Sequence, residues 1–350
     1  MSMDSTILKI RALEARVNLV LLVDHGGRAG SNFFQCVFDK HEGLIFCPLI
    51  HYVYSYWHDR FGMNEKVHKE NALKFISDFS YYRLLHNEPR GEIGDLIHKI
   101  GGDIKANFDR SKYRKLINKL CSEKKFLSRR EVIVFSMGAY AECRGFDVKK
   151  IKYIGLNDAV SLRGEDLLKR YSSQHLKQAN KDFPNIIYLA LLRDPRAQFA
   201  STRHQMINEF GNDYNLKMGN WWSSLTNLIF NRVSLDDGLA RFCLLYQVAA
   251  FKALVSIWRE SQAKWLFVKN EDINTKFLPT MTALCNKLSI SPDQAWVRDG
   301  DEFKPTMLSQ PWAGTGAYSS RYQNIKTGPL ENDPPKTIRK AIGPNSYVIR

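Results

Sequence analysis

Cysteine is scarce in this sequence, and its six copies are scattered. No two of them form a Cys-x-x-Cys pair, so the spacing signals neither a structural zinc site nor a disulfide framework. We therefore expect buried thiols. The six are Cys36, Cys47, Cys121, Cys143, Cys243 and Cys285.

Long apolar runs are also missing. The longest, such as VNLVLLV at 17–23 and IIYLALL at 186–192, fall short of the roughly 20 residues that span a bilayer. A third run, at 248–258, is interrupted by Lys252. Residues 1–16 mix charges of both signs and lack the apolar core of a secretory signal. We expect no transmembrane segment and a cytoplasmic protein.

The chain nevertheless contains enough apolar material for a sizeable core. Of its 350 residues, 44% are hydrophobic and 12% are aromatic, which suits one large domain or two ordinary ones. There is no internal repeat and no low-complexity segment. We treat residues 1–350 as a single domain.

Positive charge is in excess and unevenly spread. The formal net charge is +15, and residues 105–130 hold ten Lys and Arg against Asp109 and Glu123, so more than half of the net charge lies there. Such a stretch raises the local concentration of an anionic partner through long-range attraction. A solvated helix face followed by a loop explains it equally well, and the sequence leaves both interpretations open.

Apolar runs alternate with amphipathic stretches, and residues 50–145 are predicted to be mostly helical. The predicted strands are 17–24, 151–156, 185–192 and 265–273. The predicted helices are 5–16, 31–40, one from Pro195, 235–262, and one with Leu278, Met281, Leu284 and Leu288 on a single face. Strands separated by helices indicate an α/β fold: three layers, with a mainly parallel central sheet flanked by helices and a helical insertion at about 50–145.

The stretch DHGGRAGSN at 24–32 lies between a predicted strand and a predicted helix. Gly26, Gly27 and Gly30 let the backbone bend tightly and direct successive N–H groups into one concavity, at the positive end of the helix from Ser31. The turn therefore suits an anion. It matches neither the G-x-x-x-x-G-K-[ST] loop of nucleoside triphosphate kinases nor the G-x-G-x-x-G of dinucleotide folds. Arg28 instead offers a planar fork of donors for two oxygens of one phosphate.

A second pattern, LLRDPRAQFAS, begins within the strand predicted at 185–192. Arg193 stands at the carboxyl end of that strand, where ligands of open α/β sheets bind, and Ser201 follows two helical turns later. An arginine and a hydroxyl in these positions can hold a second phosphate. The alternative is that Arg193 and Asp194 only cap a helix.

Together these motifs resemble the sulfotransferases that use 3′-phosphoadenosine 5′-phosphosulfate (PAPS). GGRAGSN is similar to the family's 5′-phosphosulfate loop, and RDPRAQFAS matches its 3′-phosphate element, R-D-P-R-x(5)-S, without a gap. FVKNEDI at 267–273 and WAGTGAYSSRY at 312–322 resemble a late strand–helix segment and a C-terminal loop that closes over the nucleotide. The resemblance spans residues 17–325. It implies a P-loop NTPase-like sulfotransferase fold, PAPS as co-substrate and 3′,5′-adenosine bisphosphate as product.

The resemblance also implies roles for particular residues. Arg28 would stabilise the charge that develops on the leaving oxygen. Three positions depart from the family's pattern, since Gly27, Ala29 and Asn32 stand where Pro, Ser/Thr and Thr are common, which leaves the backbone donors but fewer side-chain donors. The implied PAPS-binding residues are Gly26, Gly27, Arg28, Ala29, Gly30, Ser31 and Asn32 for the 5′-phosphosulfate, Arg193 and Ser201 for the 3′-phosphate, and Gly314, Thr315 and Gly316 for the far side of the nucleotide.

An acceptor hydroxyl must lose its proton to a base within hydrogen-bond reach. The positions that relatives use correspond to His51, in CPLIHYVY, and Asp158, in IGLNDAV, with His25 as a third candidate. Each of the first two has a plainer alternative, as a helix-face histidine and a helix N-cap. No metal is implied, because a sulfuryl group carries less charge than a phosphoryl group.

Two other function classes stay open. A nucleotide-dependent kinase is disfavoured by the missing Gly-Lys-Ser/Thr, whereas a non-catalytic polyanion-binding protein on the same fold would use the segment 105–130 equally well. No nucleic-acid module is recognisable, so no nucleic-acid partner is expected. The motifs do not specify the acceptor or the oligomeric state, but the basic stretch favours an acidic carbohydrate as acceptor.

Overall fold

The structure is a computed structural model. It describes residues 3–24, 29–38, 41–46, 53–79, 108–157, 173–201 and 261–293, with Trp296 and a few residues between 248 and 259.

Five parallel strands form the central sheet, in the order β2-β5-β1-β6-β7. Because tight turns cannot join parallel neighbours, the chain crosses back over the sheet between strands and covers it with helices. This confirms the predicted α/β class with a mainly parallel sheet. The strands are β1 (Asn18–Asp24), β2 (Leu44–Phe46), β5 (Tyr153–Asn157), β6 (Ile187–Leu192) and β7 (Lys264–Lys269).

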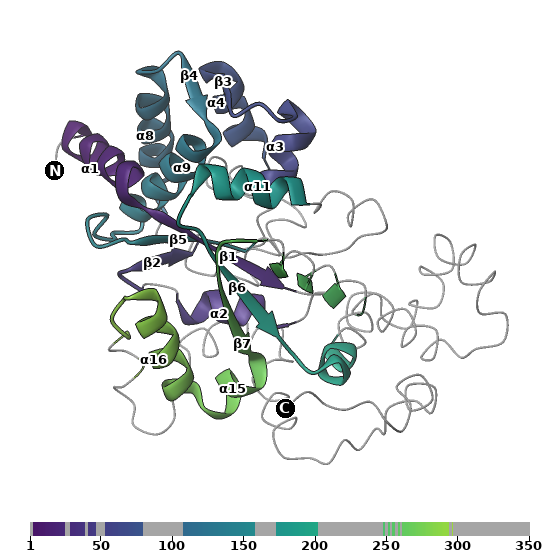
Figure 1. The fold of residues 1–350 in the computed structure, drawn as a ribbon. Coiled ribbons are helices and arrows are strands. Elements are labelled where there is room, and N and C mark those ends of the chain that lie inside the picture. The colour runs from purple at the N-terminus through teal and green to yellow at the C-terminus, as the bar shows by residue number, and fades with distance from the viewer. Residues whose placement is uncertain are drawn as a thin grey trace, which may run out of the picture.

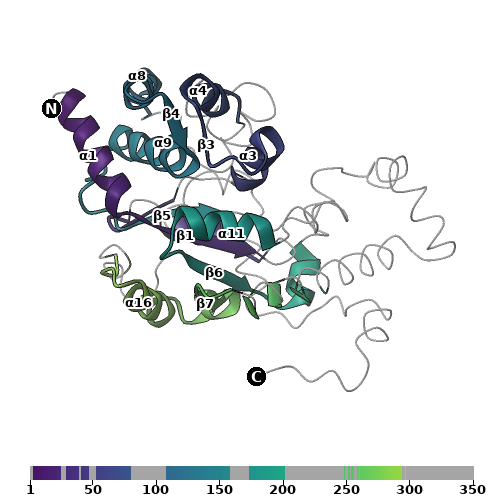
Figure 2. The same cartoon turned by 45° about the horizontal axis from the view of Figure 1, so that its top comes forward.

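Helices cover both faces of the sheet, which gives three layers (Figures 1 and 2). Leu19, Leu21 and Val23 of β1 belong to one buried cluster and Val20 and Leu22 to another, because alternate residues of a strand point to opposite faces. The first face is covered by α1 (Met3–Arg16), α3 (Val53–Phe61), α4 (Lys69–Asp78), α8 (Arg110–Ser122), α9 (Arg129–Cys143) and α11 (Ser173–Asp182). The second is covered by α2 (Ser31–Val37), α15 (Asn270–Thr275) and α16 (Phe277–Leu288).

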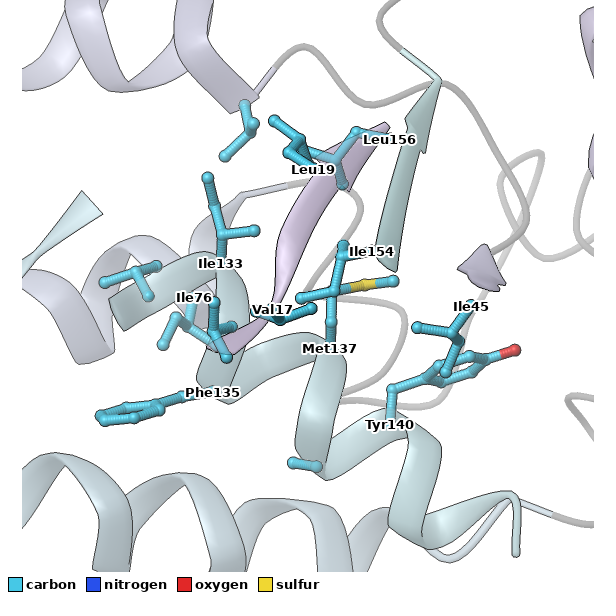
Figure 3. Close-up of a cluster of buried hydrophobic side chains, with 14 of the residues drawn as sticks. Val17, Leu19, Ile45, Ile76, Ile133, Phe135, Met137, Tyr140, Ile154 and Leu156 are labelled. Carbon is cyan, nitrogen blue, oxygen red and sulfur yellow. The ribbon is translucent and has the colours of Figure 1, made fainter. Parts of the chain in front are cut away.

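Helix α9 is the centre of the first helical layer. All residues 131–141 are buried, the pattern of a helix that is packed on every side. Figure 3 shows Met137 beside Ile154 of β5 and Tyr140 beside Ile45 of β2. The mostly helical region predicted at 50–145 therefore supplies part of the main core as well as the outer helices.

A small second sheet joins two pairs of helices. Strand β3 (Lys66–His68) connects α3 to α4, and β4 (Phe126–Ser128) connects α8 to α9; the two strands pair antiparallel. At the start of α9, the Ser128 hydroxyl accepts a bond from the Glu131 N–H at 3.1 Å, and the Glu131 carboxylate accepts one from the Ser128 N–H at 2.7 Å. This capping box fixes where α9 begins.

Arg129, the first residue of α9, is fully buried in an ion pair. Its Nε and Nη2 donate to the Asp182 carboxylate of α11 at 2.6 and 3.0 Å. Its guanidinium lies over the rings of Tyr54 and Trp57 in α3, 5.2 and 5.9 Å from the ring centroids. Forked hydrogen bonds and ring faces together stabilise this buried charge and hold α3, α9 and α11 together.

Arg130 anchors the same end of α9 to the sheet. It donates to the backbone carbonyls of Glu14, Val17 and Asp182 at 2.6, 3.1 and 2.8 Å. Val17 directly precedes β1, and Asp182 lies shortly before β6. Helix α9 therefore begins at the amino-terminal ends of these two strands, and two cations of the basic segment 105–130 have structural roles.

The observed elements differ in places from the predicted ones. The sequence pattern does not predict β2, β3 or β4, because three residues are too few to show a strand period. Residues 270–273, predicted as the end of a strand, begin α15 instead. On α16, Leu278 is exposed and Cys285 is buried in its place. The helix predicted at 235–262 lies mostly outside the described residues.

His41 joins the chain before β2 to the segment after α16. Its Nδ1 accepts bonds from the N–H groups of Gly43 and Leu44 at 3.0 and 3.2 Å, so its Nε2 must donate to the Ser291 carbonyl at 2.9 Å. This arrangement needs a neutral imidazole. Burial lowers the pKa of His41, against the opposing effects of the Ser291 carbonyl and nearby acids.

We predict that the protein loses stability as the pH falls through the range in which a free histidine titrates. Above about pH 6.5 the imidazole is neutral in both states; below it, the unfolded chain binds a proton that buried His41 does not, which lowers the free energy of unfolding by up to about 1.4 kcal/mol per pH unit. Urea unfolding at about pH 7.5 and 5.5 measures this. His41→Asn keeps an acceptor for Gly43 and Leu44 but does not titrate, and should show a smaller loss; an equal loss contradicts the prediction.

Candidate functional site

The carboxyl ends of β1, β6 and β7 lie side by side at one edge of the sheet (Figure 1). Asp24 of β1 is opposite Leu191 of β6, and Leu192 is opposite Lys269 of β7. The three segments that continue from these ends are the glycine turn, the stretch from Arg193 and the start of α15. Open α/β sheets bind ligands at this edge.

The described part of the glycine turn begins at Ala29, which is fully buried in the same apolar cluster as Phe34. Gly30 has a positive φ of 100°, a conformation that favours glycine, and its carbonyl accepts the first bond of α2, from the Phe34 N–H at 2.9 Å. Ser31, the first residue of α2, is buried. The side chain of Ala29 is therefore a packing group.

Gly30 also lies against a residue from another strand. A Cβ atom at position 30 would overlap the Asn270 amide nitrogen and lie 3.2 Å from Asn270 Cγ. Asn270, the first residue of α15, is 5% exposed, and its Oδ1 accepts a bond from Asn274 Nδ2 at 2.8 Å. The sequence motifs assign no role to Asn270. The signal available was the acidic pair Glu271 and Asp272, which is typical of the first turn of a helix.

The segment from Arg193 is a capped helix start. The Asp194 carboxylate accepts from the Arg196 N–H at 2.8 Å, and its carbonyl accepts from the Gln198 N–H at 3.0 Å, with Pro195 in the first helical position. Asp194 thus has the capping role that the sequence left open. Hydrogen bonds from Arg196 hold the pKa of the Asp194 carboxyl below its usual value.

Arg193 and Ser201 are both partly buried. Arg193 lies just before this helix, and Ser201 is the last residue of the helix that the structure describes. The Arg196 guanidinium binds the Asp194 carboxylate through Nη2 at 2.6 Å and Nε at 3.0 Å. Asp194 and Arg196 therefore neutralise each other. The predicted 3′-phosphate roles of Arg193 and Ser201 stay predictions.

The same segment is tied to α15. The Asp194 N–H donates to Glu271 Oε1 at 2.9 Å. Because Glu271 directly follows Asn270, two consecutive residues of α15 contact the glycine turn and the Arg193 segment.

Several predicted site residues lie outside the described part of the chain. They are His25, Gly26, Gly27, Arg28, His51, Asp158, Gly314, Thr315 and Gly316, together with the side chain of Asn32, whose backbone forms part of α2. Their roles stay predictions.

The described cysteines are not reactive groups. Cys121, Cys143 and Cys285 are free thiols, and burial raises the pKa of each to about 12. A thiol becomes nucleophilic as the thiolate, so these three are poor nucleophiles at neutral pH.

Two absences concern the described ranges only. No group of three or more His, Cys, Asp or Glu side chains gathers there in a way that could hold a metal ion. No helix within those ranges combines the length and apolar character needed to cross a membrane.

The described part of the basic segment 105–130 does not line the carboxyl edge. Arg114, Lys115 and Lys119 are exposed on α8, and Lys124 and Lys125 are exposed in the turn that leads to β4. Strand β4 then leads directly into α9, whose first residues are anchored at the amino-terminal ends of β1 and β6. The exposed charge of this turn therefore lies toward the opposite end of the strands from the candidate site.

Among known proteins, no family model and no curated protein matches the chain. Two of the solved structures that match the chain cover most of it. The sulfotransferase domain from the curacin biosynthetic pathway has a TM-score of 0.46 and 14% identity, over 96% of this chain and 100% of that chain. The sulfotransferase domain from the Synechococcus PCC 7002 olefin synthase has a TM-score of 0.44 and 15% identity, over 94% of this chain and 96% of that one.

We predict that Gly30→Ala destabilises the protein more than Gly145→Ala does. Both glycines have positive φ, 100° and 79°, but a Cβ at position 145 meets nothing within 4 Å, whereas one at position 30 overlaps Asn270. The strained backbone alone should cost about 1–2 kcal/mol at each site, and the overlap should add about 1–3 kcal/mol at Gly30. Urea unfolding of both variants measures the difference.

A third variant separates the two effects. Asn270→Ala, added to Gly30→Ala, should remove the overlap and recover the extra loss of stability. If Gly30→Ala and Gly145→Ala lose equal stability, the contact with Asn270 has no energetic consequence and the prediction is wrong.

Proposed function

We propose that the protein is a sulfotransferase that moves a sulfuryl group from PAPS to a hydroxyl or amine of an acceptor. One observation carries the proposal: the glycine turn and the Arg193 segment, far apart in sequence, leave the adjacent strands β1 and β6 at the same edge of the sheet. A nucleotide with phosphates at both 5′ and 3′ positions needs two such elements side by side. The motif resemblance supports the same assignment.

In the proposed mechanism, written for a hydroxyl acceptor, the acceptor oxygen attacks sulfur in line with the bond to the bridging oxygen. A new S–O bond forms as the old one breaks, its electron pair moves to the 5′-phosphate, and the acceptor proton goes to a base, for which His51 and Asp158 are the candidates. Arg28 stabilises the charge that develops on the leaving oxygen, since electrostatic stabilisation and positioning dominate comparable phosphoryl transfers. The product is 3′,5′-adenosine bisphosphate.

The acceptor is the least specified part of the proposal. The sequence favours an acidic carbohydrate through the basic segment 105–130, but Arg129 and Arg130 of that segment are structural and the turn at Lys124 lies away from the candidate site. An acidic acceptor would therefore need other cations near the carboxyl edge.

A second function is favoured by the exposed cations of α8. Arg114, Lys115 and Lys119 present positive charge to solvent and could attract a polyanion without any catalysis. A non-catalytic polyanion-binding protein is therefore the alternative, and turnover with PAPS separates the two.

The proposal predicts that 3′,5′-adenosine bisphosphate binds more tightly than ATP, because the chain has separate elements for two phosphates and no Walker lysine. Arg193→Ala should weaken this binding by roughly 1.5–3 kcal/mol and Ser201→Ala by about 1 kcal/mol, since the guanidinium is a charged donor to the phosphate whereas the hydroxyl is a neutral one. Isothermal titration calorimetry measures both changes. Arg114→Ala is the control, because it removes an equal charge from an exposed position on α8. ATP binding as tight as that of the bisphosphate would refute the proposal.

We also predict that Arg28→Ala lowers turnover more than it weakens product binding. Backbone donors can still hold the ground-state phosphate, whereas the charge on the leaving oxygen has lost its cation, and losing one preorganised donor commonly costs about a hundredfold to a thousandfold in rate. Arg28→Lys should recover part of the rate. Single-turnover rates at saturating PAPS and acceptor measure this; agreement of all three within about twofold would show that Arg28 only binds.

A further inference from the structure

We propose that Asn270 and Glu271 are positioning residues, which fix the separation of the glycine turn and the Arg193 segment so that one ligand can bind both through two phosphates. This inference rests on the proposed function and adds residues that the motifs do not assign. Both residues belong to α15 and directly follow β7, the strand that pairs with β6.

Glu271 holds the Arg193 segment by its backbone. Its Oε1 accepts the Asp194 N–H at 2.9 Å, one peptide unit beyond Arg193. On its other side, the Asp194 carboxylate is bound by Arg196 through the backbone N–H at 2.8 Å and Nε at 3.0 Å. The bend that carries Arg193 is therefore held by Glu271, which belongs to α15, and by Arg196, which belongs to the same segment as Arg193.

Asn270 holds the glycine turn by packing. Its amide orientation is set by Asn274, whose Nδ2 donates both to the Asn270 Oδ1 at 2.8 Å and to the Asn270 carbonyl at 2.7 Å. The amide nitrogen then faces Gly30, where it occupies the space that a Cβ would need. Gly30 in turn starts α2 through the bond from Phe34. The Asn270 side chain therefore packs against the residue whose carbonyl accepts the first hydrogen bond of α2.

Because Asn270 and Glu271 are consecutive, one peptide unit links the two contacts. The parallel register of β6 and β7 ends just before them, with Leu192 opposite Lys269. Once one phosphate of a bisphosphate is bound, binding of the second is intramolecular, and its effective concentration is highest when the two elements are held at the matching distance. A ligand with a single phosphate gains nothing from this fixed distance.

The test compares three ligands by isothermal titration calorimetry: 3′,5′-adenosine bisphosphate, adenosine 5′-monophosphate and adenosine 3′-monophosphate. In the wild type, the bisphosphate should bind more tightly than either monophosphate. Glu271→Ala should weaken bisphosphate binding by about tenfold, the value of one lost hydrogen bond to a charged group, and change monophosphate binding by less than about twofold. Glu271→Gln keeps an oxygen acceptor for the Asp194 N–H and should retain most of the bisphosphate affinity.

The matched control is Asp272→Ala, which removes an equal charge from the same turn of α15. The bonds described for Asp272 are accepted by its carbonyl, from Lys276 N at 2.8 Å and Thr280 Oγ1 at 3.3 Å, and survive the change. This variant should bind all three ligands like the wild type. Asn270→Ala is the second positioning variant and should show the same selective loss as Glu271→Ala.

The outcomes are distinguishable. If the wild type gains nothing from the second phosphate, both the proposed function and this inference are wrong. If the wild type shows the gain and both Glu271→Ala and Asn270→Ala keep it, the inference alone is wrong. A parallel loss for all three ligands would show a general structural role and would also overturn the positioning role.

Discussion

The parallel pairing of β1 with β6 is the constraint on which the proposed site depends. It sets Leu22 opposite Leu189 and Asp24 opposite Leu191, so both strands end at the same edge. A slip of one residue would exchange the side chains of the two buried faces, and burial on both faces therefore holds the register firmly. The glycine turn and the Arg193 segment owe their proximity to this register.

The two ends of strands β1 and β6 have different roles. At the amino-terminal ends, Arg130 binds carbonyls that precede β1 and β6, and Arg129 forms a buried pair with Asp182. At the carboxyl ends, the same two strands lead into the candidate site. Because the strands are anchored at their amino-terminal ends, the loops at their carboxyl ends are available for ligand contacts. Open α/β sheets usually bind their ligands there.

The sequence predicts the parts of the fold that have strong local signals. Strands β1 and β6 are apolar runs bounded by turn residues, and the glycine turn is recognisable from composition alone. The burial of Arg129 is not predictable in this way, because adjacent cations look like a solvated face until their partner in α11 is known. The role of Asn270 also cannot be predicted from neighbouring residues, since it comes from a contact with Gly30, which is distant in the sequence. Local pattern identifies elements, whereas tertiary contact decides which polar residues are structural.

The departure of the glycine turn from the sulfotransferase pattern that it resembles has a similar explanation. Where that pattern has Ser or Thr, Ala29 is packed in the core beside Phe34, and a hydroxyl buried there would need a partner of its own. The anion-binding capacity expected of the turn then comes mainly from backbone N–H groups and Arg28, and backbone donors bind only if the turn keeps its shape. Gly30, with its positive φ and no space for a side chain, is part of that shape. A turn with fewer side-chain donors therefore depends more on the residue packed against it, and that residue is Asn270.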